Sequence, residues 1–247
     1  MTDIPSFELA VFLGGTLAAA FVTGLAGFAF GMIAASIWLY ALTPLQTSAL
    51  IVAYGFLIQI YAVWKLRHSL NLYRLAPFIL GSAAGIPAGI VALRWISPTH
   101  LRTFVGLLLI SFSLYNLMRP KFPEIKGAGR SADAAVGFLN GVLGGATGLA
   151  GILPTIWTGL RGWSRHEQRA VFQPTAVATF LMTILAFGGV GAITPDTLRL
   201  FLIGLPALVV GSALGWLLYG KLNEVAFRKI VLALLLMAGA ALIAAGR

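Results

Sequence analysis

Long apolar segments occupy most of this 247-residue chain and constrain its fold more than any other feature. A helix needs about 20 mostly apolar residues to cross the hydrocarbon core of a bilayer. Six segments without a charged residue meet or approach this length: 45–64, 75–93, 103–118, 170–193, 200–219 and 230–246. Charged residues make up only 10% of the chain, against about 25% in soluble domains. We therefore predict an all-α polytopic membrane protein.

Two further apolar regions, 7–42 and 133–160, are too long for one helix, and glycines interrupt each near its middle. The second is too short for two full spans. We expect each region to form two helical pieces joined by a break, which leaves open whether the pair spans fully or is re-entrant. The chain then has ten helical pieces, of which eight to ten are spans.

The two halves of the chain resemble each other on either side of a basic, Pro- and Gly-containing stretch at 119–132, predicted to be a linker. Three matches run in the same order: Thr23–Gly27 with Thr147–Gly151 (TGLAG in both), Gly85/Gly89 with Gly211/Gly215, and Arg102 with Arg228. They predict a first repeat at 1–118 and a second at 133–247. Five helical pieces per half is an odd number, so the repeats are expected to be inverted.

Positive charge sets the expected orientation. The chain has 17 Lys and Arg against 7 Asp and Glu, a net charge of +10. In a membrane protein this excess is typical of the positive-inside rule and gives no reason to expect a nucleic acid. The loops 65–74, 119–132, 161–169 and 219–229 hold thirteen of these residues. Placing them in the cytoplasm leaves both termini outside it, in a multi-pass protein of the plasma or inner membrane.

The sequence also argues against several kinds of chemistry. There is no cysteine, no Walker A motif and no cluster of metal-ligating side chains. No serine has a His or Lys partner within the apolar segments, and no carboxylate lies deep in a predicted span, where proton relays usually lie. The first apolar segment lacks a basic residue before it and is expected to stay in place. We expect no enzyme, no cofactor and no metal.

The two TGLAG breaks are the strongest candidates for a functional site. Non-helical backbone at membrane depth is tolerated only where it is buried in protein or lines a cavity. The N–H groups at the helix start after a break favour an anion. We expect Thr23 and Thr147 to cap those starts or bind substrate, with the substrate between the breaks. The alternative is close packing through small residues, which we prefer for Gly85/Gly89 and Gly211/Gly215. The candidate substrate-binding residues are Thr23, Gly24, Leu25, Ala26, Gly27, Thr147, Gly148, Leu149, Ala150, Gly151, Gln173 and Thr175.

With these motifs the chain resembles the TauE/SafE family of membrane permeases, the sulfite exporters. The likeness rests on its size, the central linker and the Gly-rich segments GLAGFAFG and GGATGLAGILP. The family's Gly-rich run is followed by proline, which the second half keeps as Pro154 and the first half lacks. The resemblance implies a secondary transporter that exports sulfite or organosulfonates.

Two other functions stay open beside this one. A ten-helix, inverted-repeat exporter of neutral metabolites or drugs can share the same plan, and a membrane enzyme or assembly factor would need a catalytic constellation that the sequence does not contain. The expected partners are a small anionic substrate and the lipid bilayer. Homo-oligomerisation, the coupling ion and the exact substrate are left open by the sequence.

Overall fold

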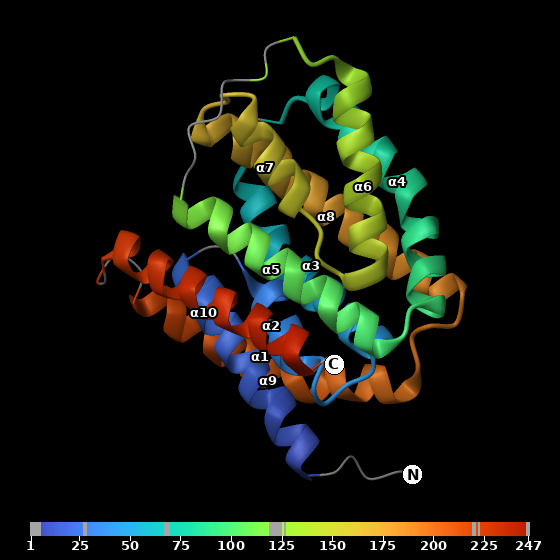
Figure 1. The fold of residues 1–247 in the computed structure, drawn as a ribbon, viewed down its shortest axis with the longest axis vertical. Helices are drawn as coiled ribbons and strands as arrows, with labels where there is room; N and C mark the ends of the chain where they lie inside the picture. The colour runs from blue at the N-terminus through green and yellow to red at the C-terminus, as the bar shows by residue number, and fades with distance from the viewer. Residues whose placement is uncertain are drawn as a thin grey trace. The chain divides into compact units, whose positions relative to one another are not determined.

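The computed structural model describes residues 6–26, 29–66, 70–118, 125, 127–218, 221 and 223–245. Within these residues the protein consists of ten α-helices and contains no strand (Figure 1). The helices are α1 (Ser6–Ala26), α2 (Phe30–Trp38), α3 (Pro44–Leu66), α4 (Leu72–Trp95), α5 (Pro98–Met118), α6 (Arg130–Thr147), α7 (Ile152–Leu160), α8 (Arg165–Gly189), α9 (Pro195–Leu218) and α10 (Glu224–Ala245).

Six of these helices are long and apolar enough to cross a membrane: α1, α4, α5, α8, α9 and α10. Five of them coincide with the segments predicted from the sequence. The remaining segment, 45–64, forms α3, whose apolar part among the described residues is Pro44–Ile60. Both glycine-interrupted regions fold as two helices, as expected. In the first region the two helices differ in length: α1 has 21 residues and α2 has nine.

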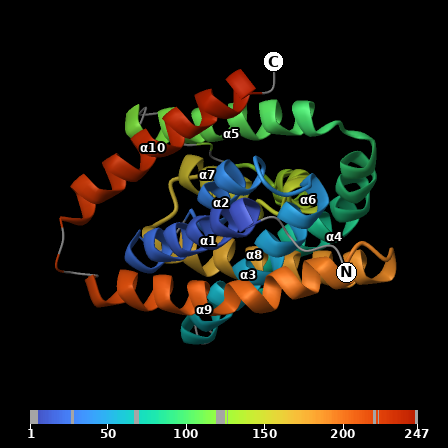
Figure 2. The same ribbon diagram turned by 90° about the horizontal axis from the view of Figure 1, so that it is seen from below.

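The chain forms two compact units, and each draws helices from both halves of the sequence. Unit 1 comprises Met1–Thr47, Ile96–Pro120 and Thr194–Arg247, and unit 2 comprises Ser48–Trp95 and Lys121–Ile193. In unit 1, α1 packs against α9 and α5 runs beside α10 (Figure 2). In unit 2, α4 packs against α6, and α8 contacts α4, α6 and α7. Each unit thus contains one broken helix pair, α1/α2 or α6/α7.

Glycines allow the closest helix contacts in both units. A Cβ atom at Gly85 or Gly89 of α4 would collide with a carbonyl oxygen of α6, of Phe138 or Val142. In unit 1 a Cβ atom at Gly211 of α9 would lie 2.6 Å from a carbonyl oxygen of α1. Small residues let helix backbones approach in this way in membranes. The packing interpretation of the Gly-x-x-x-Gly pairs is confirmed.

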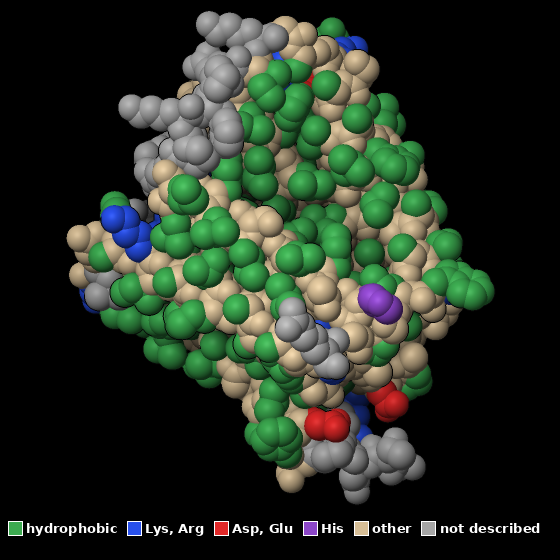
Figure 3. Space-filling model, in the orientation of Figure 1, with side chains coloured by type: hydrophobic (Ala, Val, Ile, Leu, Met, Phe, Trp, Pro, Cys, Tyr) green, Lys and Arg blue, Asp and Glu red, His purple; other side chains and the backbone are tan. Residues whose placement is uncertain are grey.

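The outward surface is apolar along the long helices. Leu80 of α4, Leu202 of α9 and Leu234 of α10 are all more than half exposed. The face shown in Figure 3 carries many hydrophobic side chains, with few charged groups among them. Such a surface suits a lipid environment, because hydrocarbon tails are as apolar as leucine. The structure therefore agrees with a multi-pass membrane protein.

Candidate functional site

The second TGLAG motif forms a sharp break between α6 and α7. Helix α6 ends at Thr147, and Gly148 and Gly151 on either side of the break adopt left-handed backbone angles, with φ of 75° and 93°. Residues other than glycine rarely adopt this conformation. Arg161, just after α7, forms an ion pair with Asp133 in the first turn of α6, with an Nη1–Oδ1 distance of 2.8 Å. The two helices therefore fold back on each other as a hairpin.

Asn140 of α6 holds this break in place from within unit 2. Its side chain is fully buried, and its Oδ1 accepts a hydrogen bond from the Gly151 N–H at 2.8 Å. Its Nδ2 donates to Ser82 Oγ of α4 and to Thr179 Oγ1 of α8, both at 3.2 Å. One amide thus ties the break to three helices. Sequence reasoning missed Asn140, although a lone amide inside the apolar region 133–160 was a usable signal.

The start of α7 carries no side-chain cap. Thr147 was expected to cap it, but this hydroxyl donates to the Leu143 carbonyl of α6 at 2.7 Å and accepts from the Leu149 N–H at 3.2 Å. It therefore finishes α6 instead of starting α7. The first turn of a helix has no internal acceptors for its N–H groups. Those of Ile152 and Leu153 lie at this uncapped end, ahead of Pro154.

Helix α8, which carries the second set of candidate residues, packs against the break. A Cβ atom built on Gly151 would lie 3.1 Å from the Cβ of Ala176. Beside Ala176, Thr175 is fully buried and its hydroxyl has no hydrogen-bond partner among the described residues. Gln173 is half-buried. The structure thus brings Gly151 against Ala176, the chain neighbour of Thr175, while Gln173 and Thr175 stay candidates.

The middle of the second motif packs against the apolar interior of unit 2. Leu149 is 3% exposed, and Ala150 packs on the cluster of Val52, Ala176 and Phe180. A Cβ atom at Gly148 would lie 2.9 Å from the Ser48 carbonyl oxygen of α3. This part of the motif is held by apolar contacts and close backbone approach.

The first TGLAG copy has a different backbone, although its sequence is identical. Thr23, Gly24 and Leu25 continue α1, which ends at Ala26, and the Thr23 hydroxyl donates to the Ala19 carbonyl at 2.7 Å. A Cβ atom at Gly24 would lie 2.6 Å from the Ser212 carbonyl oxygen of α9. Gly27 lies outside the described residues. The expectation that Thr23 caps α2 is wrong, since α2 begins after Ala29 without a side-chain cap.

The first helix pair is also a hairpin, closed by an aromatic side chain. Trp38 at the end of α2 donates from Nε1 to the Phe12 carbonyl of α1 at 3.2 Å. Its ring packs between those of Phe12 and Phe30, with centroid distances of 5.2 and 6.1 Å. Trp38 is fully buried. This end of the hairpin is therefore closed by apolar packing and one neutral hydrogen bond.

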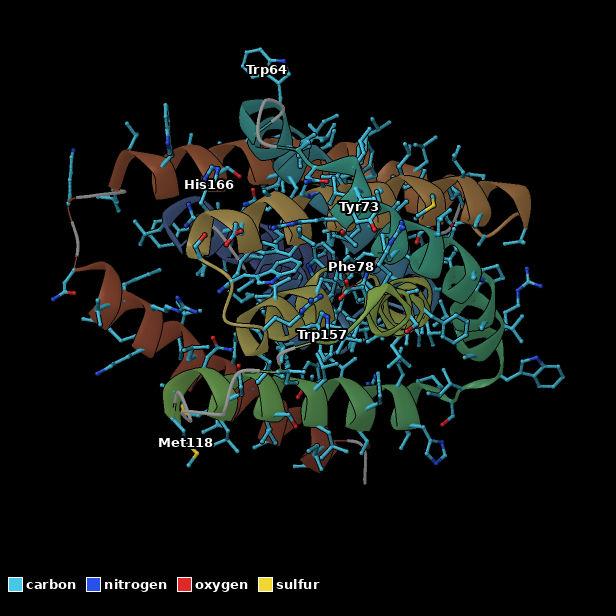
Figure 4. The ribbon with its side chains drawn as sticks, turned by 90° about the horizontal axis from the view of Figure 1, so that it is seen from above. Trp64, Tyr73, Phe78, Met118, Trp157 and His166 are labelled. Carbon is cyan, nitrogen blue, oxygen red and sulfur yellow. The ribbon has the colours of Figure 1, made fainter. Side chains whose placement is uncertain are left out.

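Charged residues gather instead at the open end of the α6/α7 hairpin. Asp133 accepts from Trp157 Nε1 at 2.7 Å and from Arg161. Arg161 lies 5.0 Å from the ring of Trp163, and Arg74 lies 5.2 Å from the same ring. Figure 4 shows Trp157 among the helices of unit 2, while Trp64 points away from them. No three His, Asp or Glu side chains gather as a metal site in the described part of the chain.

Two helical hairpins within apolar helical units place this protein among polytopic membrane proteins, and the break at the uncapped start of α7 is a feature of transporters. The chain belongs to the sulfite exporter TauE/SafE family, whose model matches residues 11–242. This is a family of membrane transporters, not of enzymes. Neither a curated protein nor a solved structure matches the chain.

Proposed function

We propose that this protein exports small sulfur-containing oxyanions, such as sulfite or organosulfonates, and binds them at the break between α6 and α7. The observations that carry the proposal are the uncapped start of α7, next to which Gly151 lies against Ala176 of α8, and the buried hydroxyl of the adjacent Thr175, which has no hydrogen-bond partner among the described residues. Free N–H groups and the positive end of the helix dipole favour an anion at this place. Thr175 adds a donor that can replace part of the lost hydration.

The lengths of the two helices support a site near the middle of the bilayer. Helix α6 has 18 residues and α7 has nine, which correspond to about 27 Å and about 14 Å. The hydrocarbon core is about 30 Å thick. With the Asp133–Arg161 end of the hairpin at the membrane surface, α7 reaches about halfway across. The pair is then re-entrant rather than two full spans.

Contacts between helix ends support the proposed sidedness. Arg74 in the first turn of α4 pairs with Glu167 in the first turn of α8 at 2.9 Å, which joins the two basic segments 65–74 and 161–169 of unit 2. At the other end of unit 2, Arg94 donates to the Val190 carbonyl at 3.3 Å. Each half contributes three of the six helices that are long enough to cross, again an odd number. The proposal therefore keeps inverted repeats and places both termini outside the cytoplasm.

The candidate residues at the break are neutral: Thr147–Gly151, Gln173 and Thr175. Neutral donors suit a singly charged oxyanion, whose export from a negative-inside cell is favourable by about 2.3 kcal/mol per 100 mV. The same donors also suit a neutral polar metabolite, which is the competing substrate class. Membrane potential separates the two, because transport of a neutral substrate by itself moves no charge.

The test is transport by the purified full-length protein in liposomes. Labelled sulfite, ethanesulfonate, sulfate and a neutral amino acid are loaded, and efflux is followed with an imposed potassium diffusion potential of either sign. We expect efflux of sulfite or ethanesulfonate that accelerates when the loaded side is negative. Efflux of the amino acid alone, insensitive to potential, would replace the proposal with the neutral-metabolite function.

A further inference from the structure

A buried carboxylate at the open end of the α6/α7 hairpin plays no part in the site at the break. Asp133 is 7% exposed in the first turn of α6. Its Oδ1 and Oδ2 lie 2.8 and 3.0 Å from Arg161 Nη1, and Trp157 Nε1 donates to Oδ1 at 2.7 Å. A guanidinium and an indole N–H directed at two oxygens form an arrangement that any small oxyanion suits.

Closing a hairpin does not by itself require this charge pair. The α1/α2 hairpin is closed by Trp38, which donates to a backbone carbonyl and packs between two phenylalanine rings. A buried ion pair adds little net stability compared with apolar residues of similar size. The charges of Asp133 and Arg161 therefore call for a role other than closure.

The surroundings of Arg161 attract anions. Arg161 and Arg74 both lie over the ring of Trp163, and Arg130 lies one turn before Asp133 on α6. Glu167 offsets Arg74, to which it is paired at 2.9 Å. Among these described groups three guanidinium groups face two carboxylates. Without the Asp133 carboxylate, the Arg161 guanidinium would lose its counter-charge and the Trp157 N–H would lose its acceptor.

We propose that Arg161 and Trp157 form a first anion site at the mouth of the hairpin, in which Asp133 stands in for the substrate. An incoming sulfonate or sulfite headgroup displaces the Asp133 carboxylate and takes over its donors. The displaced carboxylate stays at the N-terminal turn of α6, where the helix dipole favours it. This inference rests on the proposed function, since it assigns the same substrate class an earlier binding step.

The test compares Asp133→Asn with Arg161→Gln by calorimetric titration of the purified full-length protein with ethanesulfonate. Removing the competing carboxylate is expected to lower the dissociation constant about tenfold, and removing the guanidinium is expected to raise it about tenfold, the scale of a charge-assisted hydrogen bond. Trp157→Phe keeps the ring and removes one donor, so it is expected to weaken binding severalfold. It serves as the second variant if Asp133→Asn fails to fold.

The double variant Asp133→Asn/Arg161→Gln separates an anion site from a structural pair. An anion site stays weak in the double variant, because the guanidinium is gone. A merely structural pair predicts weaker binding in each single variant and recovery in the double, and that result would overturn the inference. Efflux from liposomes is measured separately for the same variants. Tighter binding by Asp133→Asn without any transport of sulfur oxyanions would retain the mouth site and reject the proposed function.

Discussion

The two hairpins, α1/α2 and α6/α7, differ in the residues that form their turns and in the contacts that close their open ends. The α1/α2 pair is closed by Trp38 and turns through Ala29, the one described non-glycine residue with positive φ, at 80°. The α6/α7 pair turns through two glycines, is held by Asn140, and is closed by Asp133 and Arg161. Charged and amide side chains thus hold the α6/α7 hairpin, whereas apolar side chains hold the α1/α2 hairpin. The proposed function accordingly assigns the substrate to the second hairpin and gives the first a structural role.

The largest expected effect is at the glycines of the second break. Gly148→Val places a branched side chain at φ 75° and 2.9 Å from the Ser48 carbonyl oxygen. Left-handed strain and overpacking together are expected to cost about 3 kcal/mol. Thermal unfolding in detergent measures the loss. The matched change in the first hairpin is Ala29→Gly, which relieves the same strain and is expected to leave stability within about 1 kcal/mol. Equal losses of stability in the two variants would contradict the expected difference between the hairpins.

Asn140→Leu tests whether the amide clamp distinguishes the hairpins. It removes the acceptor of the Gly151 N–H and leaves that buried donor unpaired, at an expected cost of about 2 kcal/mol. Efflux should fall together with stability. The control is Thr16→Val in α1, where a fully buried hydroxyl bonds only to the preceding turn, at the Phe12 carbonyl. A Thr16→Val loss as large as that of Asn140→Leu would contradict the special role of the clamp.

Thr175→Val should separate stability from transport. The wild-type hydroxyl is buried without a partner, so an apolar isostere is expected to stabilise the protein by about 1 kcal/mol. Efflux of ethanesulfonate should nevertheless fall about tenfold, because a donor to the dehydrated anion is lost. Thr183→Val, two turns further along α8, removes another unpartnered hydroxyl and should stabilise without slowing efflux. Slower efflux in both variants would move the site along α8.

The smallest effect is expected at the exposed basic start of α8. Arg169 is exposed, and Arg169→Gln should leave unfolding unchanged and slow efflux modestly at low ionic strength, because the mouth attracts fewer anions. The difference should shrink as salt approaches about 0.15 M, where charges are screened beyond about 8 Å. A deficit that persists at high salt would mean that Arg169 contacts the substrate directly.

Local information in the sequence was sufficient for the class of the protein and for its two broken helix pairs, although among the described residues only the second TGLAG copy forms the break itself. Apolar length predicted the membrane-spanning helices, because desolvation of the backbone leaves few alternatives in lipid. The glycine pairs predicted close helix packing, which Gly85 against α6 and Gly211 against α1 confirm. The interrupted regions 7–42 and 133–160 predicted helix pairs. These features depend on residues near one another in the chain.

The conformations of the two TGLAG copies and the role of Asn140 were decided by the tertiary structure, because they depend on residues distant in sequence. The two TGLAG copies differ because one packs on α9, where Gly24 meets Ser212, and the other packs on α3, where Gly148 meets Ser48. A pentapeptide with two glycines has little backbone preference of its own, so the helices packed against it determine its conformation. Asn140 likewise became part of the candidate site only when folding brought α4, α8 and the break around its amide. Burial makes those hydrogen bonds obligatory, and burial is a property of the packed helices.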